Sequence, residues 1–184
     1  MIEGQYLDLH YEGKFDLSID DYLGMVSRKT GALLRCSVNS GVVLGDSSED
    51  QKSHLSKAAS ALGYAFQIRD DILGTWGDQN STGKPVGADI RRKKNALPMV
   101  HLMNYIEQEA RQRIIALMQG DNLEENDVQL ILGHMHSVGS YEFCQNLAEQ
   151  FCSTARDEII FSGVPRIFMS DFEELIEFVA RRVH

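Results

Sequence analysis

The residues from Ser48 to Leu73 repeat apolar side chains at the spacing of an α-helix, with no proline to interrupt them. Ser48 and Gln51 form a capping-box pattern that marks where this helix begins. Residues three and four apart share one helix face, so the pattern predicts a long helix with an apolar face to bury. Its apolar positions are Leu55, Ala58, Leu62, Phe66 and Leu73.

Helical patterns account for most of the remaining chain. A second capping-box pattern, Ser18 and Asp21, opens a helix that is predicted to run to about Leu44. Another is predicted from about Ala96, where Pro98 lies in the first turn and is tolerated. Three prolines and the lack of alternating apolar runs argue against strands. We therefore expect a single all-α domain over 1–184, with a loop at 74–87 and further helices at 5–11, 107–118, 124–135, 141–160 and 171–183.

The composition narrows the classes of protein to which the chain can belong. A formal net charge of −9 argues against binding to nucleic acid or to an anionic membrane surface, since both reward positive charge. Cys36, Cys144 and Cys152 fall in apolar helical stretches, so we expect buried free thiols and a reducing, cytoplasmic location. No apolar run approaches the ~20 residues of a transmembrane segment, and the first residues do not resemble a signal peptide.

Two carboxylates, Asp70 and Asp71, stand at the end of the long predicted helix. Gln67 and Asp70 are three residues apart and share a face, whereas Asp71 lies about 100° around the helix. Adjacent carboxylates beside a buried face are costly without a cation. Their oxygens suit Mg²⁺, which takes one or two carboxylates plus substrate phosphates. The alternative is a solvated helix end, where the helix dipole opposes negative charge.

Basic residues lie near this acidic pair in the sequence. Residues 83–89 (GKPVGAD) include Lys84 and lead into the basic run at 91–94, which favours a diphosphate held between metal ions and ammonium groups. Lys29 and Thr30 stand in the middle of another predicted helix. The glycine that follows them lowers helix propensity by roughly 1 kcal/mol relative to alanine, and would suit a close approach of backbone or substrate. The alternatives are a solvated basic surface and a lysine at the edge of the core.

In order and spacing, these segments resemble the trans-isoprenyl diphosphate synthases, the polyprenyl synthetase family. The resemblance covers about the first 100 residues, with the motifs in 1–98; the remainder, 99–184, matches only in its helical character. The matching segments are residues 4–8 (GQYLD), 29–31 (KTG), 66–71 (FQIRDD), 83–84 (GK), 87–89 (GAD), Lys94 and Pro98.

The resemblance implies an all-α bundle around a deep pocket, in which an allylic diphosphate is joined to isopentenyl diphosphate. It implies Mg²⁺ as the cofactor, Asp70 as the main metal ligand on this side and Asp71 as its support. The lysines would stabilise the leaving diphosphate as its charge develops. The implied catalytic residues are Lys29, Gln67 and Lys84, and the implied substrate-binding residues are Lys29, Thr30, Gln67, Lys84 and Lys94.

The sequence departs from the family pattern in two places. The second aspartate-rich motif usually reads Asp-Asp-x-x-Asp, but its fifth position here is Gly74, so one carboxylate is lost. The first aspartate-rich motif and the basic isopentenyl diphosphate site lie upstream of the segment that matches Gly4. We therefore expect the C-terminal part of a longer enzyme, a bundle without its N-terminal helices, which is inactive or weak by itself.

Several alternatives stay open at this point. The chain could be truncated, start at a mis-assigned methionine or be a natural half-length protein. It could also be a non-catalytic partner subunit of a prenyltransferase, or a terpene cyclase, which uses the same ionisation without isopentenyl diphosphate. The resemblance implies a homo-oligomer or a partner subunit, and an incomplete bundle should expose apolar surface and self-associate. Product chain length is set near the first motif and is not predicted.

Overall fold

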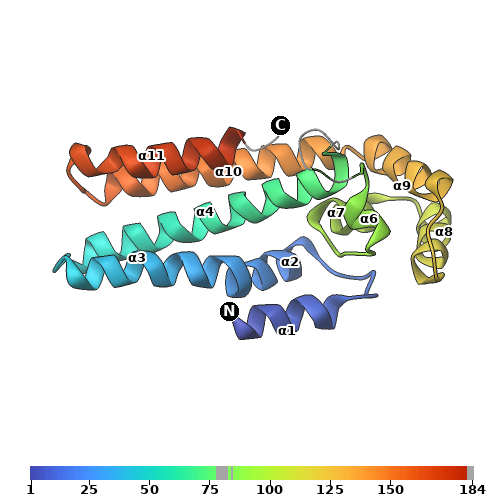
Figure 1. Ribbon diagram of the computed structural model, residues 1–184, viewed down its shortest axis with the longest axis horizontal. Helices are drawn as coiled ribbons and strands as arrows, with labels where there is room; N and C mark the ends of the chain where they lie inside the picture. The colour runs from blue at the N-terminus through green and yellow to red at the C-terminus, as the bar shows by residue number, and fades with distance from the viewer. Residues whose placement is uncertain (78–82, 84, 182–184) are drawn as a thin grey trace.

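Every element in the described part of the computed structural model is helical (Figure 1). The structure describes residues 1–77, 83 and 85–181, and in these the prediction of an all-α chain is confirmed. The elements are α1 (Ile2–Tyr11), α2 (Ile19–Val26), the π-helical turn η1 (Ser27–Gly31), α3 (Ala32–Leu44), α4 (Glu49–Trp76), α6 (Ala88–Arg91), α7 (Leu97–Tyr105), α8 (Gln108–Gln119), α9 (Glu125–Ser137), α10 (Ser140–Phe161) and α11 (Arg166–Arg181).

The long helix α4 lies between two groups of helices (Figure 1). α10 and α11 form an antiparallel pair along one side of it, and the arm made of α2, η1 and α3 lies along the other, with α1 outside that arm. α4 contacts α10 most extensively and α3 next. The short helices α6 and α7 also pack against α4, so α4 is the element on which the other groups meet.

The apolar face of α4 is buried, as its periodicity predicts. Leu55, Ala58 and Leu62 are at most 7% exposed, and Phe66 packs against the cluster that joins α4 to α10 and α11. Full burial of a large aliphatic side chain stabilises a fold by about 1.5–3 kcal/mol. Packing on both sides of α4 therefore supplies much of the driving force for this arrangement.

Cys144 and Cys152 are buried in the core, and burial raises the pKa of both thiols. The prediction that all three cysteines are buried is wrong for Cys36, which is exposed on α3. Cys36 lies on a face of α3 that no described residue covers, whereas α10 is enclosed between α4 and its neighbours.

Both predicted capping boxes are present. The Ser18 hydroxyl accepts a hydrogen bond from the Asp21 backbone N–H at 3.0 Å, and the Asp21 carboxylate accepts one from the Ser18 N–H at 3.0 Å. Ser48 and Gln51 exchange the equivalent bonds at 3.2 and 3.1 Å. These bonds satisfy backbone N–H groups that the first turn of a helix leaves without partners.

The helix predicted from Ser18 to Leu44 is interrupted by the π-helical turn η1, which the sequence pattern does not reveal. Two helix boundaries and one short helix also differ from expectation. α4 runs to Trp76 because that ring packs edge-on against Tyr141 of α10, with centroids 5.1 Å apart. α11 begins at Arg166, directly after Pro165, whose carbonyl accepts a hydrogen bond from the Phe168 N–H at 2.9 Å. The short helix α6 lies in a segment with too few periodic residues to predict it.

Large apolar side chains are exposed on the outer faces of α1, α3 and α11. They include Ile2, Leu9, Leu33, Val43, Leu44, Ile167, Phe168 and Phe178. Apolar surface of this kind favours association, and the self-association expected from the sequence stays a prediction. Among the described helices, none combines the length and apolar character that crossing a bilayer requires.

We expect the Ser48→Ala substitution to lower the free energy of unfolding by about 1 kcal/mol, because it removes the cap from the N-terminus of α4. Urea unfolding followed by circular dichroism measures this change. Ser40→Ala is the matched control, since the Ser40 hydroxyl is exposed within α3 and bonds only the Cys36 carbonyl of its own helix. Equal losses in the two variants would contradict a capping role for Ser48.

Candidate functional site

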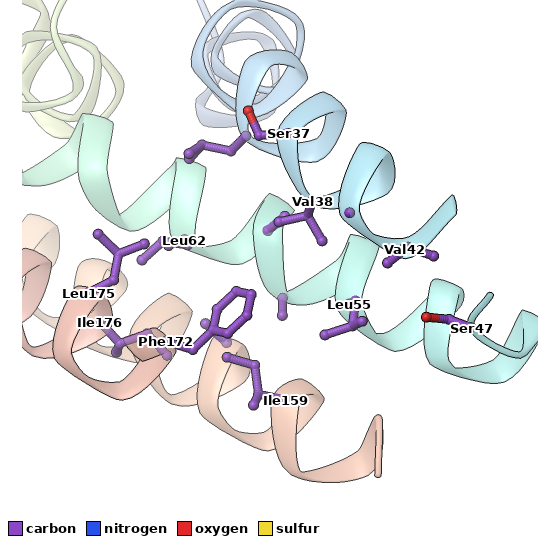
Figure 2. Close-up of a pocket in the computed structure, with 15 residues that line it drawn as sticks. Ser37, Val38, Val42, Ser47, Leu55, Leu62, Ile159, Phe172, Leu175 and Ile176 are labelled. Carbon is purple, nitrogen blue, oxygen red and sulfur yellow. The ribbon is translucent and has the colours of Figure 1, made fainter. Parts of the chain in front are cut away.

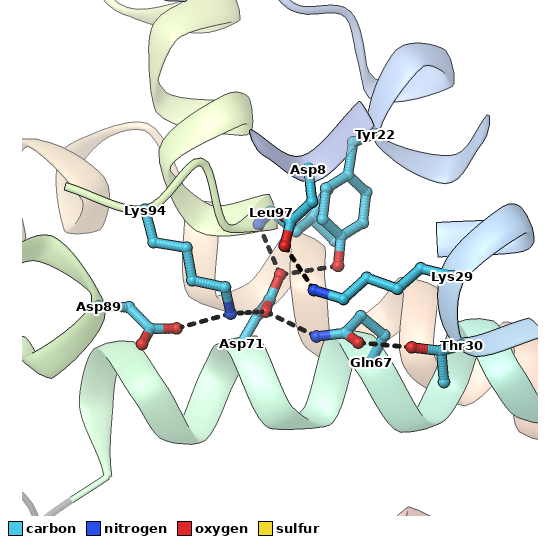
Figure 3. A network of polar contacts seen from close by, with 9 residues as sticks. All are labelled: Asp8, Tyr22, Lys29, Thr30, Gln67, Asp71, Asp89, Lys94 and Leu97. Carbon is cyan, nitrogen blue, oxygen red and sulfur yellow. Dashed lines mark hydrogen bonds and ion pairs between the residues drawn. The ribbon is translucent and has the colours of Figure 1, made fainter. Parts of the chain in front are cut away.

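The carboxylate of Asp71 lies at the centre of a polar network that joins four segments of the chain (Figure 3). Its Oδ2 accepts hydrogen bonds from the Tyr22 hydroxyl at 2.7 Å and from the Leu97 backbone N–H at 2.9 Å. Its Oδ1 accepts from the Lys94 ammonium at 2.8 Å and from the Gln67 amide at 3.2 Å. Asp71 is 1% exposed. A buried carboxylate is tolerated here because four donors replace the water it has lost.

These contacts argue against the metal-ligand role that the sequence analysis gives to Asp71. An ionised carboxylate has about four lone-pair sites, and protein donors take four bonds from this one. The Gln67 amide bonds Asp71, a contact that the sequence analysis does not predict. Residues four apart share a helix face as well as residues three apart do, and Asp71 is the carboxylate that turns inward.

The Asp71 carboxylate also caps α7. Helix α7 begins at Leu97, and its N-cap residue, Ala96, has no side-chain oxygen to bond the first N–H groups. The Asp71 carboxylate accepts the Leu97 N–H instead, and its negative charge lies at the positive end of the helix dipole. One side chain of α4 therefore stabilises the first turn of α7.

The donors around Asp71 have shifted pKa values. Burial, together with the Asp71 charge, raises the pKa of Tyr22 well above its ordinary value. Burial alone would lower the pKa of Lys94, but the Asp71 and Asp89 carboxylates outweigh it and raise that pKa. Tyr22 is therefore a neutral donor and Lys94 a cation at neutral pH.

Asp70 occupies a different environment from its neighbour. Its side chain is only partly buried, near the C-terminal end of α4. Its negative charge is close enough to raise the pKa values of Tyr22 and Asp89, after the larger effect of burial. In the described residues no group of three histidine, cysteine, aspartate or glutamate side chains is placed to hold a metal ion. A magnesium ion at Asp70 would draw on ligands beyond the described side chains, and Mg²⁺ commonly takes one or two carboxylates together with water and phosphate oxygens.

Lys29 and Thr30 project from the π-helical turn η1 towards the same network (Figure 3). The Lys29 ammonium forms an ion pair with Asp8 of α1 at 2.5 Å. The Thr30 hydroxyl donates to the Gln67 carbonyl at 2.8 Å, and the Gln67 amide donates to Asp71. The structure thus brings together Lys29, Thr30, Gln67 and Asp71, as the sequence analysis expects of a shared site.

The remaining basic candidates behave differently from one another. Lys94 reaches Asp71 and also Asp89, at 3.1 Å. Its neighbours in the basic run point elsewhere: Arg91 pairs with Glu125 of α9, and Lys93 bonds the Gly120 carbonyl. Of the basic residues at 91–94 whose contacts are described here, Lys94 is therefore the one that lies beside the acidic pair. Lys84 lies outside the described residues.

Gly74, the departure from the family motif, lies against the Asp89 carboxylate. A Cβ atom added at Gly74 would be 2.2 Å from Asp89 Oδ2 and 2.5 Å from its Cγ. A carboxylate is thus present in the space beside position 74, but it comes from α6 rather than from α4. Burial raises the pKa of Asp89, the Asp71 and Asp70 charges add to this, and Lys94 opposes it.

An apolar cavity of about 470 Å³ lies between α3, α4, α10 and α11 (Figure 2). It begins one helical turn beyond Thr30, at Leu34, and α4 contributes Leu55 and Leu62 to its wall. Ile159 of α10 and Phe172 of α11 close the opposite side. The polar network is therefore followed along α3 and α4 by an apolar space, rather than by further charged groups.

The sequence profile of the polyprenyl synthetase family matches residues 1–135. The chain belongs to the polyprenyl synthetase family. This chain is 33% identical over 183 residues to the geranylfarnesyl diphosphate synthase of Aeropyrum pernix. The match covers 98% of this chain and 56% of the synthase. It is 35% identical over 127 residues to the short chain isoprenyl diphosphate synthase of Methanocaldococcus jannaschii, covering 69% of this chain and 38% of that one.

Solved structures of polyprenyl synthetases share the fold over nearly the whole chain. The geranylgeranyl pyrophosphate synthetase of Pyrococcus horikoshii Ot3 matches with a TM-score of 0.89 and 31% identity, covering 98% of this chain and 54% of that one. Similarity therefore extends beyond the first 100 residues, where the motifs alone had placed its limit. This polyprenyl synthetase chain spans about half the length of most of the relatives it matches.

Four contributors to the network were given no role by the sequence analysis. Asp8 and Asp89 lie within segments that carry the family resemblance, but their partners are distant in sequence. Tyr22 lies in an apolar stretch and looks like an ordinary core residue. The Leu97 N–H is a backbone group, which no motif can reveal.

The Tyr22 and Lys94 contacts predict a loss of stability at alkaline pH. Both pKa values are raised in the folded chain above their ordinary values of 10.0 and 10.5. The folded state then holds these protons more tightly than the unfolded state, so stability is full below about pH 10 and falls as the pH rises further. Urea unfolding at a series of pH values measures this fall.

The Tyr22→Phe substitution tests the origin of the loss. It leaves the buried Asp71 carboxylate with one hydrogen-bond donor fewer. We therefore expect the free energy of unfolding to fall by about 1–3 kcal/mol at neutral pH. It should also flatten the alkaline decline. Tyr6→Phe is the matched control, because Tyr6 is 63% exposed on α1. An unchanged decline in the Tyr22 variant would show that another group causes it.

We expect Gly74→Asp to destabilise the chain rather than restore the family motif. The new Cβ would displace the Asp89 carboxylate from Lys94, and overpacking of this kind costs about 1–3 kcal/mol. In an Asp89→Ala background the same substitution should cost much less, because the space beside position 74 is then free. Thermal unfolding of the four combinations measures the coupling, and equal costs in both backgrounds would contradict it.

Proposed function

We propose that this chain supplies the diphosphate-ionising side of a prenyltransferase site that joins an allylic diphosphate to isopentenyl diphosphate. The observation that carries the proposal is the convergence of Lys29, Thr30 and Gln67 on the last turns of α4, beside the partly exposed Asp70. Family membership supports the same class of reaction.

The two neighbouring carboxylates have separate roles in this proposal. Asp71 is fixed inside the protein and holds Gln67 and Lys94 in place. Asp70 binds magnesium together with the diphosphate oxygens. Bound Mg²⁺ would polarise the diphosphate and lower the free energy of its departure.

The basic groups of this chain stabilise the charge that develops on the leaving diphosphate. Lys29 is partly exposed, with 28% of its side-chain surface accessible, and its ion pair with Asp8 keeps the extended side chain ordered before substrate arrives. Lys84 is proposed for the same role on the strength of its motif alone. Lys94, with 31% of its side-chain surface accessible, is already held by Asp71 and Asp89, so its contribution is to orient these carboxylates.

The apolar cavity offers space for the hydrocarbon part of an allylic substrate. Its 470 Å³ volume falls within the usual range of small-molecule sites. Its walls are almost entirely aliphatic or aromatic, and their burial against a prenyl chain is favourable at about 25 cal/mol per Å². We propose that the first aspartate-rich motif comes from another polypeptide segment, which packs on the exposed apolar faces of this chain.

A partner-subunit role is the second candidate. The exposed apolar faces of α1, α3 and α11 favour it, since they would be covered by an associated chain. Light scattering of the purified chain, alone and mixed with a full-length synthase, distinguishes self-association from formation of a mixed complex.

The Asp70→Asn and Asp71→Asn variants test the division of roles. Titration calorimetry with an allylic diphosphate and Mg²⁺ should show affinity weakened at least about tenfold in Asp70→Asn, with little change in the melting temperature. Asp71→Asn should instead lower the free energy of unfolding by about 3 kcal/mol, since it leaves Lys94 without its closest partner.

Asp157→Asn is the matched control, because Asp157 is exposed on α10 away from the site. It should change neither quantity. Normal diphosphate binding by Asp70→Asn would overturn the assignment of the metal ligand. Loss of binding in Asp71→Asn without loss of stability would transfer that role to Asp71.

A further inference from the structure

The π-helical turn η1 is packed unusually closely by two glycines from other helices. Gly4 is the only residue of α1 that is buried. A Cβ atom added to it would lie 2.2 Å from the Lys29 backbone nitrogen and 2.5 Å from the Lys29 Cα. Helix α1 therefore lies directly on the backbone of the turn, at a distance that no side chain at position 4 would permit.

Gly63 of α4 makes a similar approach. A Cβ atom at this position would lie 2.9 Å from the Gly31 Cα and 3.3 Å from the Gly31 nitrogen. The two helices meet here through the backbone of one glycine and the Cα of the other. A side chain at Gly63 would have to move backbone atoms, because no flexible side-chain end lies between them.

Each of these glycines stands one helical turn before a residue that holds a side chain of η1. Gly4 precedes Asp8 by four residues, and Asp8 pairs with Lys29. Gly63 precedes Gln67 by four residues, and Gln67 accepts the hydrogen bond of Thr30. Residues four apart project from one face of a helix, so each helix presents a close-packing glycine and a polar partner to the same turn.

We infer that Gly4 and Gly63 are positioning residues for Lys29 and Thr30. They fix how deeply α1 and α4 sit against η1, and so fix whether Asp8 and Gln67 reach their partners. A π-helical turn, in which hydrogen bonds join residues five apart, is rare and is found frequently at functional sites. Close packing of backbone on both contacts holds this turn in one conformation.

This inference rests on the proposed diphosphate site, and a double-mutant cycle separates the two. Gly4→Ala should move α1 outward and so break the ion pair between Asp8 and Lys29. α1 is a peripheral helix (Figure 1), so the rest of the chain remains folded. With inorganic pyrophosphate and Mg²⁺ as the probe, we expect Gly4→Ala to weaken binding about tenfold at a temperature well below its melting point.

The same substitution should have no further effect on pyrophosphate affinity in a Lys29→Met background, because the residue through which Gly4 acts is then absent. A purely structural role would give the same loss in both backgrounds, and that outcome would overturn the inference. Gly63→Ala paired with Thr30→Val provides a parallel cycle, since valine keeps the shape of threonine without its hydroxyl.

Gly133→Ala is the matched control. Gly133 is exposed within α9, and a Cβ atom there would meet nothing within 4 Å. It should bind pyrophosphate as the unmodified chain does, and the loss of a helical glycine should make it slightly more stable. Affinity weakened equally in the Gly133 and Gly4 variants would contradict a specific role for Gly4.

Amide hydrogen exchange gives a readout that needs no ligand. In Gly4→Ala, the amides of 27–31 should exchange about tenfold faster than in the unmodified chain, while those of α9 should not change. If the unmodified chain fails to bind pyrophosphate, the proposed function is wrong, but this exchange result still tests whether Gly4 holds η1 in one conformation. Unchanged exchange at 27–31 would overturn it.

Discussion

The buried carboxylate of Asp71 is the interaction on which the rest of the polar structure depends. It joins α4 to α2 through Tyr22, to α7 through the Leu97 N–H, and to the α6–α7 segment through Lys94. Burying a charge is expensive unless donors replace its hydration, so the folded arrangement is favourable only when all of these segments are in place together. Such a group adds less to net stability than to the choice of one arrangement among several apolar packings.

The inward direction of Asp71 means that its neighbour Asp70 lies in a different environment, which is only partly buried. Consecutive residues of a helix differ by about 100° in direction, so two adjacent carboxylates leave the helix towards different sides. Because Asp71 turns to the Tyr22 and Leu97 donors, Asp70 turns towards the partly exposed side. The motif of two adjacent aspartates thus places a structural acceptor, Asp71, beside the carboxylate that we propose as a metal ligand, and Gln67 connects Asp71 to Thr30.

Helix periodicity and the two capping boxes predicted most of the fold, because both depend on residues close together in sequence. Gln67 and Thr30 were also predicted as site residues, although only the resemblance to the family related one to the other. The π-helical turn, α6 and the partners Asp8, Tyr22 and Asp89 were not predicted. Each depends on contacts between residues far apart in sequence, and the pattern of neighbouring residues gives no signal for such contacts.

Gly74 shows how such contacts alter the meaning of a motif. Read along the sequence, glycine at this position removes a carboxylate from the acidic face of α4. In space, the Asp89 carboxylate fills the volume beside it and shares Lys94 with Asp71. The space beside position 74 therefore keeps a negative charge. Because Gly74 has no side chain, Asp89 of α6 can pack directly against α4. Since both carboxylates offset the burial of Lys94, the glycine is better understood as part of the packing that holds this lysine than as a defect in the proposed metal site.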